Sequence, residues 1–251
     1  MGFEIALAIV GGLIIIVSIY ALIVSIWLSV KYVKFNRKKN SAGLTGEQVA
    51  RRILDDNGLY HIGVKVTGSV MFGNSYSHYF KKVRLRRFTR HKDSLTSLGI
   101  GAQKASLAIL DKEGDKDMRK RIRLIPLITF GPFAFIPLVI IGAVIDYFLL
   151  NQTGVITLVL GGVGLLFYAY SLILSVLTLK TEKKAQERAY EILREKNLAT
   201  EEELASLKEL FHLYNVQYVN DIILASLELI YLALQIYSAV QGNNTSSSNN
   251  K

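Results

Sequence analysis

The sequence predicts a mainly α-helical integral membrane protein, with about four transmembrane helices and a small α+β domain between the first and the second. Half of the 251 residues are hydrophobic, and they gather in four long runs that charged blocks separate. A helix needs about 20 apolar residues to cross the hydrocarbon core of a bilayer, and the four runs meet or approach that length. The blocks between them are rich in lysine and arginine, which gives the chain a formal net charge of +10.

The first apolar run predicts a transmembrane helix over residues 1–30. No charge interrupts the sequence from Ile5 to Val30, and basic residues follow from Lys31 onwards. A cleaved signal peptide has a basic start and a shorter apolar stretch, so we expect this helix to be retained.

Three further transmembrane helices are expected, at residues 124–150, 155–179 and 219–240. The fourth run is the least apolar, because it contains Asp221 and Glu228. The segments outside the four runs are a basic domain at 31–123, a helical segment at 180–218 and a polar tail at 241–251, which we expect to be disordered.

Basic residues flank the predicted spans on one side only. They follow the first run, precede the second and follow the third, whereas the loop at 151–154 carries no charge. Since lysine and arginine mark the cytoplasmic ends of membrane helices, we predict a multi-pass protein of the cell membrane whose soluble parts are cytoplasmic. The absence of cysteine agrees with that compartment.

The domain at 31–123 contains 22 basic and 8 acidic residues, and its sequence predicts helices and short strands. Thr45 and Gln48 have the spacing of a capping box, and Asn57-Gly58 is a suitable helix stop. Short strands are expected near 64–72, an extended segment at 79–89 and a second helix at 94–110. Gly99 and Gly101 weaken that last helix by composition.

The stretch from Ser41 to Tyr60, which reads SAGLTGEQVARRILDDNGLY, resembles the start of the soluble domain in the bacterial membrane-bound neutral zinc metallopeptidase family. The order of elements agrees over about residues 1–240. The resemblance implies a zincin-like cytoplasmic domain, with an H-E-x-x-H helix before the second span. It also implies a glutamate beyond the third span as third zinc ligand.

The catalytic motif of that family is replaced in this sequence. Gln103 and Leu107 stand where the resemblance places the two histidines, Lys104 stands where it places the glutamate, and Glu182 is retained at the third-ligand position. Leucine cannot ligate zinc, and lysine cannot serve as the carboxylate base. We therefore expect no catalytic residue and no cofactor, whereas a working family site would hold zinc.

The sequence shows no other pattern that would restore catalysis. It has no cysteine nucleophile and no phosphate-binding loop, and no pair of its four histidines has the spacing of helical metal ligands. A metal site in which His78 and His91 meet in a hairpin remains an alternative to ordinary surface histidines.

A basic cluster between Lys81 and Lys92 is expected to bind anionic lipids or a partner, or to be solvated. Its members are Lys81, Lys82, Arg84, Arg86, Arg87 and Arg90. Anionic lipids of an inner leaflet attract basic residues close to the membrane. Aromatic residues interleave with these charges, as in some nucleic-acid-binding surfaces, but no nucleic-acid-binding motif accompanies them. We therefore favour the lipid bilayer as the partner.

The acidic residues Asp146 and Glu228 lie at or within apolar runs, where acids are candidates for ion or solute transport. The loss of the metal ligands nevertheless favours a pseudo-peptidase. This would be a family scaffold without the chemistry, which acts as a membrane scaffold or regulator. Another membrane protein is a candidate partner. The alternatives are an active membrane zinc metallopeptidase with an atypical site and a small transporter.

Overall fold

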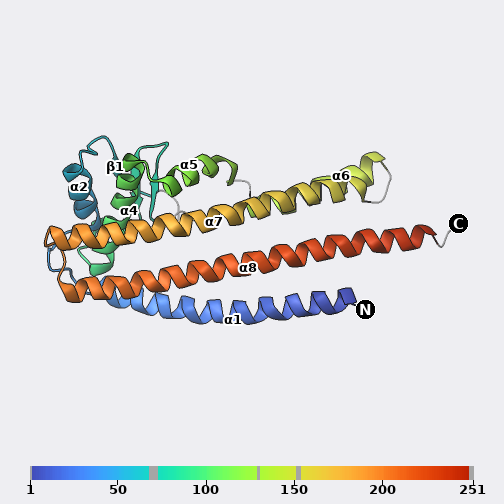
Figure 1. The fold of residues 1–251 in the computed structure, drawn as a ribbon, viewed down its shortest axis with the longest axis horizontal. Helices are drawn as coiled ribbons and strands as arrows, with labels where there is room; N and C mark the ends of the chain where they lie inside the picture. The colour runs from blue at the N-terminus through green and yellow to red at the C-terminus, as the bar shows by residue number, and fades with distance from the viewer. Residues whose placement is uncertain (1, 68–72, 129–130, 151–153, 249–251) are drawn as a thin grey trace. The chain divides into compact units, whose positions relative to one another are not determined.

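The computed structural model describes residues 2–67, 73–128, 131–150 and 154–248 (Figure 1). Its elements in chain order are α1 (Gly2–Arg37), α2 (Gly46–Asp56), β1 (Gly63–Val66), β2 (Ser75–Ser77), β3 (Lys82–Leu85), α3 (Arg87–His91), α4 (Leu95–Glu113), α5 (Lys116–Ile128), α6 (Gly131–Ile145), the π-helical η1 (Asp146–Leu150), α7 (Val155–Glu195) and α8 (Glu201–Ser248). The protein is thus mainly helical with one small sheet, which confirms the general class that the sequence predicts.

The chain forms two compact units. The first contains residues 1–22, 124–176 and 219–251, and the second contains residues 23–123 and 177–218. The second unit holds the sheet and the helices α2 to α4, and the sites described below lie within one unit or the other.

Three helices are long and apolar enough to cross a membrane within the described part of the chain. They cover Phe3–Arg37, Val155–Glu195 and Glu201–Ser238. Large apolar side chains of α1 such as Ile16 and Trp27 are exposed, as suits a helix surrounded by lipid. Among the described residues of the run at 124–150, a shorter apolar helix covers Phe135–Phe148, and the fourth span stays a prediction.

Helix α2 begins and ends where the sequence predicts. The Gln48 amide N–H donates to the Thr45 hydroxyl at 3.3 Å, and the Gln48 side-chain oxygen accepts from the Thr45 N–H at 2.8 Å. Gly58 follows the helix in the left-handed conformation, with a φ of +66°. The buried face of α2, which includes Ile53 and Leu54, packs in the core of the second unit.

The sheet has the strand order β1-β3-β2, with β1 parallel and β2 antiparallel to β3. Val64 and Tyr76 pair with Val83 on the buried face of the sheet. The extended segment predicted at 79–89 is correct only for β3, because the chain turns into the short helix α3 at Arg87. The short strands expected near 64–72 include Val70 and Phe72, and these two residues lie outside the described part of the chain.

Helix α4 is the central helix of the second unit, and every residue from Leu95 to Leu110 is buried. Its N-terminus is capped by the Ser94 hydroxyl, which accepts from the Ser97 N–H at 3.1 Å. A Cβ atom at Gly99 would collide with Leu207 of α8, and one at Gly101 would collide with the backbone of α2. The two glycines are therefore points of close packing rather than weak points of the helix.

The segment at 180–218 is formed by the end of α7 and the start of α8. The chain breaks between them at Asn197, whose φ is +51°, and Thr200 with Glu203 forms a second capping box. Helix α8 then continues to Ser248. Most of the tail predicted to be disordered thus lies in this helix, and residues 249–251 are outside the described part.

Candidate functional site

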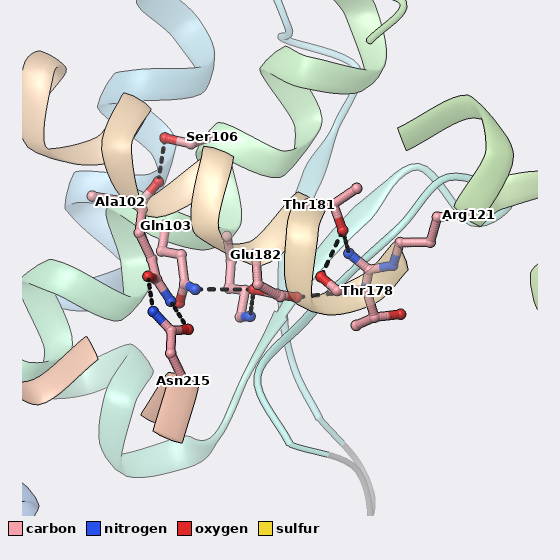
Figure 2. A network of polar contacts seen from close by, with 10 residues as sticks. Ala102, Gln103, Ser106, Arg121, Thr178, Thr181, Glu182 and Asn215 are labelled. Carbon is pink, nitrogen blue, oxygen red and sulfur yellow. Dashed lines mark hydrogen bonds and ion pairs between the residues drawn. The ribbon is translucent and has the colours of Figure 1, made fainter. Parts of the chain in front are cut away.

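The carboxylate of Glu182 on α7 is the centre of a polar cluster inside the second unit (Figure 2). Two neighbouring side chains of α4 reach the same carboxylate oxygen, Oε2. The Lys104 Nζ donates at 2.7 Å and the Gln103 Nε2 donates at 2.9 Å. Lys104 and Glu182 have side chains that are only 10% and 17% exposed, so this ion pair is largely shielded from water.

Arg121 of α5 holds the opposite side of the same carboxylate. Its guanidinium donates to Glu182 Oε1 at 3.4 Å and to the Thr181 hydroxyl at 2.9 Å. Burial by itself would raise the pKa of the Glu182 carboxyl, but the positive charges of Lys104 and Arg121 outweigh it and hold that pKa below its ordinary range. The carboxylate is therefore ionised at neutral pH and shared between two cations.

Leu107, one helical turn beyond Gln103, takes no part in this cluster. Its side chain is fully buried among the apolar residues of the core. Close by, Gln186 of α7 and Asn215 of α8 form a reciprocal pair of amide hydrogen bonds at 3.0 and 2.8 Å (Figure 2). The amide pair links α7 to α8, as the Glu182 cluster links α4 and α5 to α7.

These residue types do not fit a zinc ion. Zinc in proteins takes thiolate, imidazole and carboxylate ligands, whereas the groups around Glu182 are an amide, an ammonium and a guanidinium. A divalent cation at this carboxylate would have to displace two positive charges. No group of three potential histidine, cysteine, aspartate or glutamate ligands occurs among the described residues.

Part of the predicted basic cluster forms the outer face of the sheet. Lys82 and Arg84 are two residues apart on β3, and both lie over the ring of Phe80, each 5.1 Å from its centroid. Lys65 of β1 pairs with Arg84 across the sheet, and its side chain is exposed. The Phe80 ring is itself 64% exposed, so charge and aromatic surface occur together on this face.

The other members of the cluster have different surroundings. Arg90 donates to both carboxylate oxygens of Glu47 on α2, so its charge is neutralised inside the domain. Lys81 and Arg87 are exposed, and Arg86, which is also exposed, lines a cavity next to the Glu182 cluster. The structure therefore separates residues that the sequence places in a single group.

The acidic residues of the first unit have protein partners. Asp146 is 4% exposed and accepts hydrogen bonds from the backbone N–H groups of Ile156 and Thr157 and from the Thr157 hydroxyl, at 2.7–3.0 Å. It thus caps the first turn of α7, where N–H groups lack partners within the helix. Glu228 accepts a hydrogen bond from the Tyr168 hydroxyl at 2.8 Å.

A further cluster, which the sequence does not indicate, joins the sheet to the end of α4. Asp111 Oδ2 accepts from the Tyr76 hydroxyl and lies against His78 Nδ1, both at 2.6 Å. His78 therefore has a carboxylate partner, whereas His91 is exposed at the end of α3. The partners are more than 30 residues apart in the chain, so no local motif could have pointed to them.

The chain is similar to proteins of one described family. The family described as "Putative neutral zinc metallopeptidase" matches residues 10–237. A protein of Bacillus subtilis (strain 168) described as "Putative membrane protease YugP" is 27% identical over 186 residues, which cover 72% of this chain and 77% of that protein. No solved structure matches.

Proposed function

Because the chain belongs to the neutral zinc metallopeptidase family, it carries the family scaffold, and we propose that it is a non-catalytic member that acts as a membrane scaffold or regulator. The observation that carries this proposal is the ion pair between Lys104 and Glu182, 2.7 Å long and largely buried. Glu182 is the residue that the resemblance assigns as third zinc ligand, and its carboxylate is already neutralised by side chains of the protein.

The ion pair supplies the structural link that a shared metal ion would provide. In the family motif, ligands on one helix and a glutamate on another hold the same ion. Here the Lys104 ammonium on α4 binds the glutamate on α7 directly. Leu107, at the second histidine position, adds apolar burial that contributes about 1.5–3 kcal/mol. The two helices are therefore joined without a metal, and the scaffold keeps its fold without the chemistry.

Peptidase activity of the full chain tests this proposal. Purified protein in mild detergent is expected to leave casein intact, with and without added zinc. Chelator-sensitive cleavage of casein by the unmodified protein would overturn the proposal and favour an active metallopeptidase with an atypical site.

A restored motif provides the positive control. The triple variant Gln103→His, Lys104→Glu, Leu107→His has the two imidazoles one helical turn apart and the carboxylate base between them. We expect it to bind zinc, whereas a matched variant that keeps Leu107 should bind much more weakly. The difference would show that the scaffold still places these positions around one ion.

We also propose that the second unit faces the cytoplasm and contacts anionic lipid through the basic face of its sheet. The support is the set of exposed or half-exposed cations on this face of the sheet, namely Lys82 and Arg84 over Phe80, and Lys65, which pairs with Arg84. Because the chain has no cysteine, an environment-sensitive dye can be attached to Lys81→Cys alone. In nanodiscs the emission of the dye should shift with anionic lipid but not with neutral lipid. Added salt should abolish the shift, and so should the double variant Lys82→Gln, Arg84→Gln. Equal emission in both lipids would contradict this part.

A further inference from the structure

A cavity of about 340 Å³ lies beside the Glu182 cluster, entirely within the second unit. Its walls come from the segment before β2, from the residue that follows β3, and from α4, α7 and α8. The side chains that matter here are Arg86, Lys104, Glu182 and Tyr214. The volume is at the lower end of the range for small-ligand pockets, so it suits a small molecule or the end of a chain rather than a folded partner.

Positive charge exceeds negative charge around this cavity. Among the described residues of its lining, Glu182 is the one with a carboxylate, and two cations, Lys104 and Arg121, already share it. Arg86 adds a third cation, and no ion pair of Arg86 with an acidic residue occurs in the described part of the chain. The side chains at the cavity therefore leave a net positive charge for a ligand to neutralise.

Hydrogen-bond donors are also in excess. The Lys104 ammonium has three N–H groups and donates one to Glu182, so two have no hydrogen-bond acceptor among the described residues. The Arg86 guanidinium carries five N–H donors in a planar fork, a shape that matches carboxylate and phosphate oxygens. Tyr214 also lines the cavity, and its side chain carries a hydroxyl donor.

From this arrangement we propose that the cavity is an anion-binding site that takes the carboxylate or phosphate group of a small ligand, with Arg86 and Lys104 as its binding cations. The inference rests on the proposed non-catalytic function, because Lys104 and Glu182 supply the site only while no metal occupies it. The proposed ligand of the scaffold is then the anionic end of a peptide or a small phosphorylated compound.

Isothermal titration of the full chain in detergent tests the site with three probes at constant ionic strength. These probes are inorganic phosphate, a short peptide with a free C-terminal carboxylate and the same peptide with an amidated C-terminus. We expect saturable one-to-one binding of phosphate or of the free peptide, and the stronger of the two identifies the source of the anion. The amidated peptide should bind far more weakly, because it lacks the charge.

The variant Arg86→Gln should weaken that binding roughly tenfold, as expected for the loss of a charge-assisted hydrogen bond. Arg87→Gln is the matched control, because Arg87 is the next residue, is exposed and does not line the cavity. Binding that is equal in the two variants, or no binding of phosphate and free peptide, would overturn the anion site. Neither of these outcomes changes the result expected in the casein assay. A failure of the anion site can therefore be distinguished from a failure of the proposed non-catalytic function.

Discussion

Glu182 lies on α7 and Asp146 lies against the start of the same helix, and both acidic side chains are largely shielded from water, but different groups bind them. Glu182 is bound by side chains, Lys104 and Gln103 from α4 and Arg121 from α5. Asp146 is bound mainly by backbone N–H groups at the start of α7. The first arrangement depends on the identity of three side chains next to a cavity. The second depends on backbone N–H groups at a helix end, which any residues except proline would provide at those positions.

The comparison teaches which acidic residue to regard as functional. A carboxylate that caps a helix satisfies backbone groups which need an acceptor anyway, so the position of Asp146 is explained by folding alone. A carboxylate between two buried cations has no such structural necessity, since an apolar pair of similar volume would often be as stable. Glu182 is therefore the residue that needs a functional explanation.

The largest expected effect comes from removing the charge of Glu182. Glu182→Gln should destabilise the protein by about 3 kcal/mol, because Lys104 and Arg121 are left without their counter-charge in a shielded site. Denaturant unfolding of the full chain in detergent, followed by circular dichroism, measures the change. Glu187→Gln, at an exposed position of the same helix, should change stability by less than about 0.5 kcal/mol. Equal losses in both variants would show that the cluster contributes nothing specific.

The stabilities of the unmodified protein and of Glu182→Gln should respond differently to pH. The pKa of Glu182 in the folded protein lies below its ordinary value of 4.5, so the stabilisation is complete above about pH 4.5 and is lost as the pH falls through the lowered pKa. The difference in melting temperature between the unmodified protein and Glu182→Gln should therefore be constant near neutral pH and shrink in acid. A difference that persists unchanged in acid would mean that the Glu182 charge is not its source.

A smaller effect is expected at Asp146. Asp146→Ala should cost about 1 kcal/mol, the usual effect of losing a helix cap, whereas Asp146→Asn should cost less because its amide oxygen can still accept from one of the two backbone N–H groups. Thermal unfolding in nanodiscs compares the two variants. If asparagine were as harmful as alanine, the charge of Asp146 rather than its hydrogen bonds would matter, and a transport role would regain support.

Local features of the fold were predictable because their signals lie within a few residues. The capping box at Thr45 and the helix at 94–110 each follow from short spacings of capping and apolar residues. The helix α3 was missed, because the alternating Lys82, Val83 and Arg84 continued to suggest a strand beyond the point where the strand ends.

The site itself was predictable only in part. The resemblance assigned Lys104 and Glu182 to positions of one family site, and the structure joins the two side chains in an ion pair. The roles of Arg121 and of the Tyr76–Asp111–His78 cluster could not be predicted, because they depend on contacts between residues far apart in the chain. The separation of Arg90 from the other basic residues likewise depends on its position opposite Glu47.

The metal content of the purified full chain tests the central claim most directly. Elemental analysis after growth with zinc in the medium should find no stoichiometric zinc, because Lys104 and Arg121 already neutralise the carboxylate of Glu182 and Leu107 offers no ligand. One zinc ion per chain that disappears in Glu182→Ala would contradict the account, since it would show that Glu182 binds a metal ion in spite of its two cationic partners.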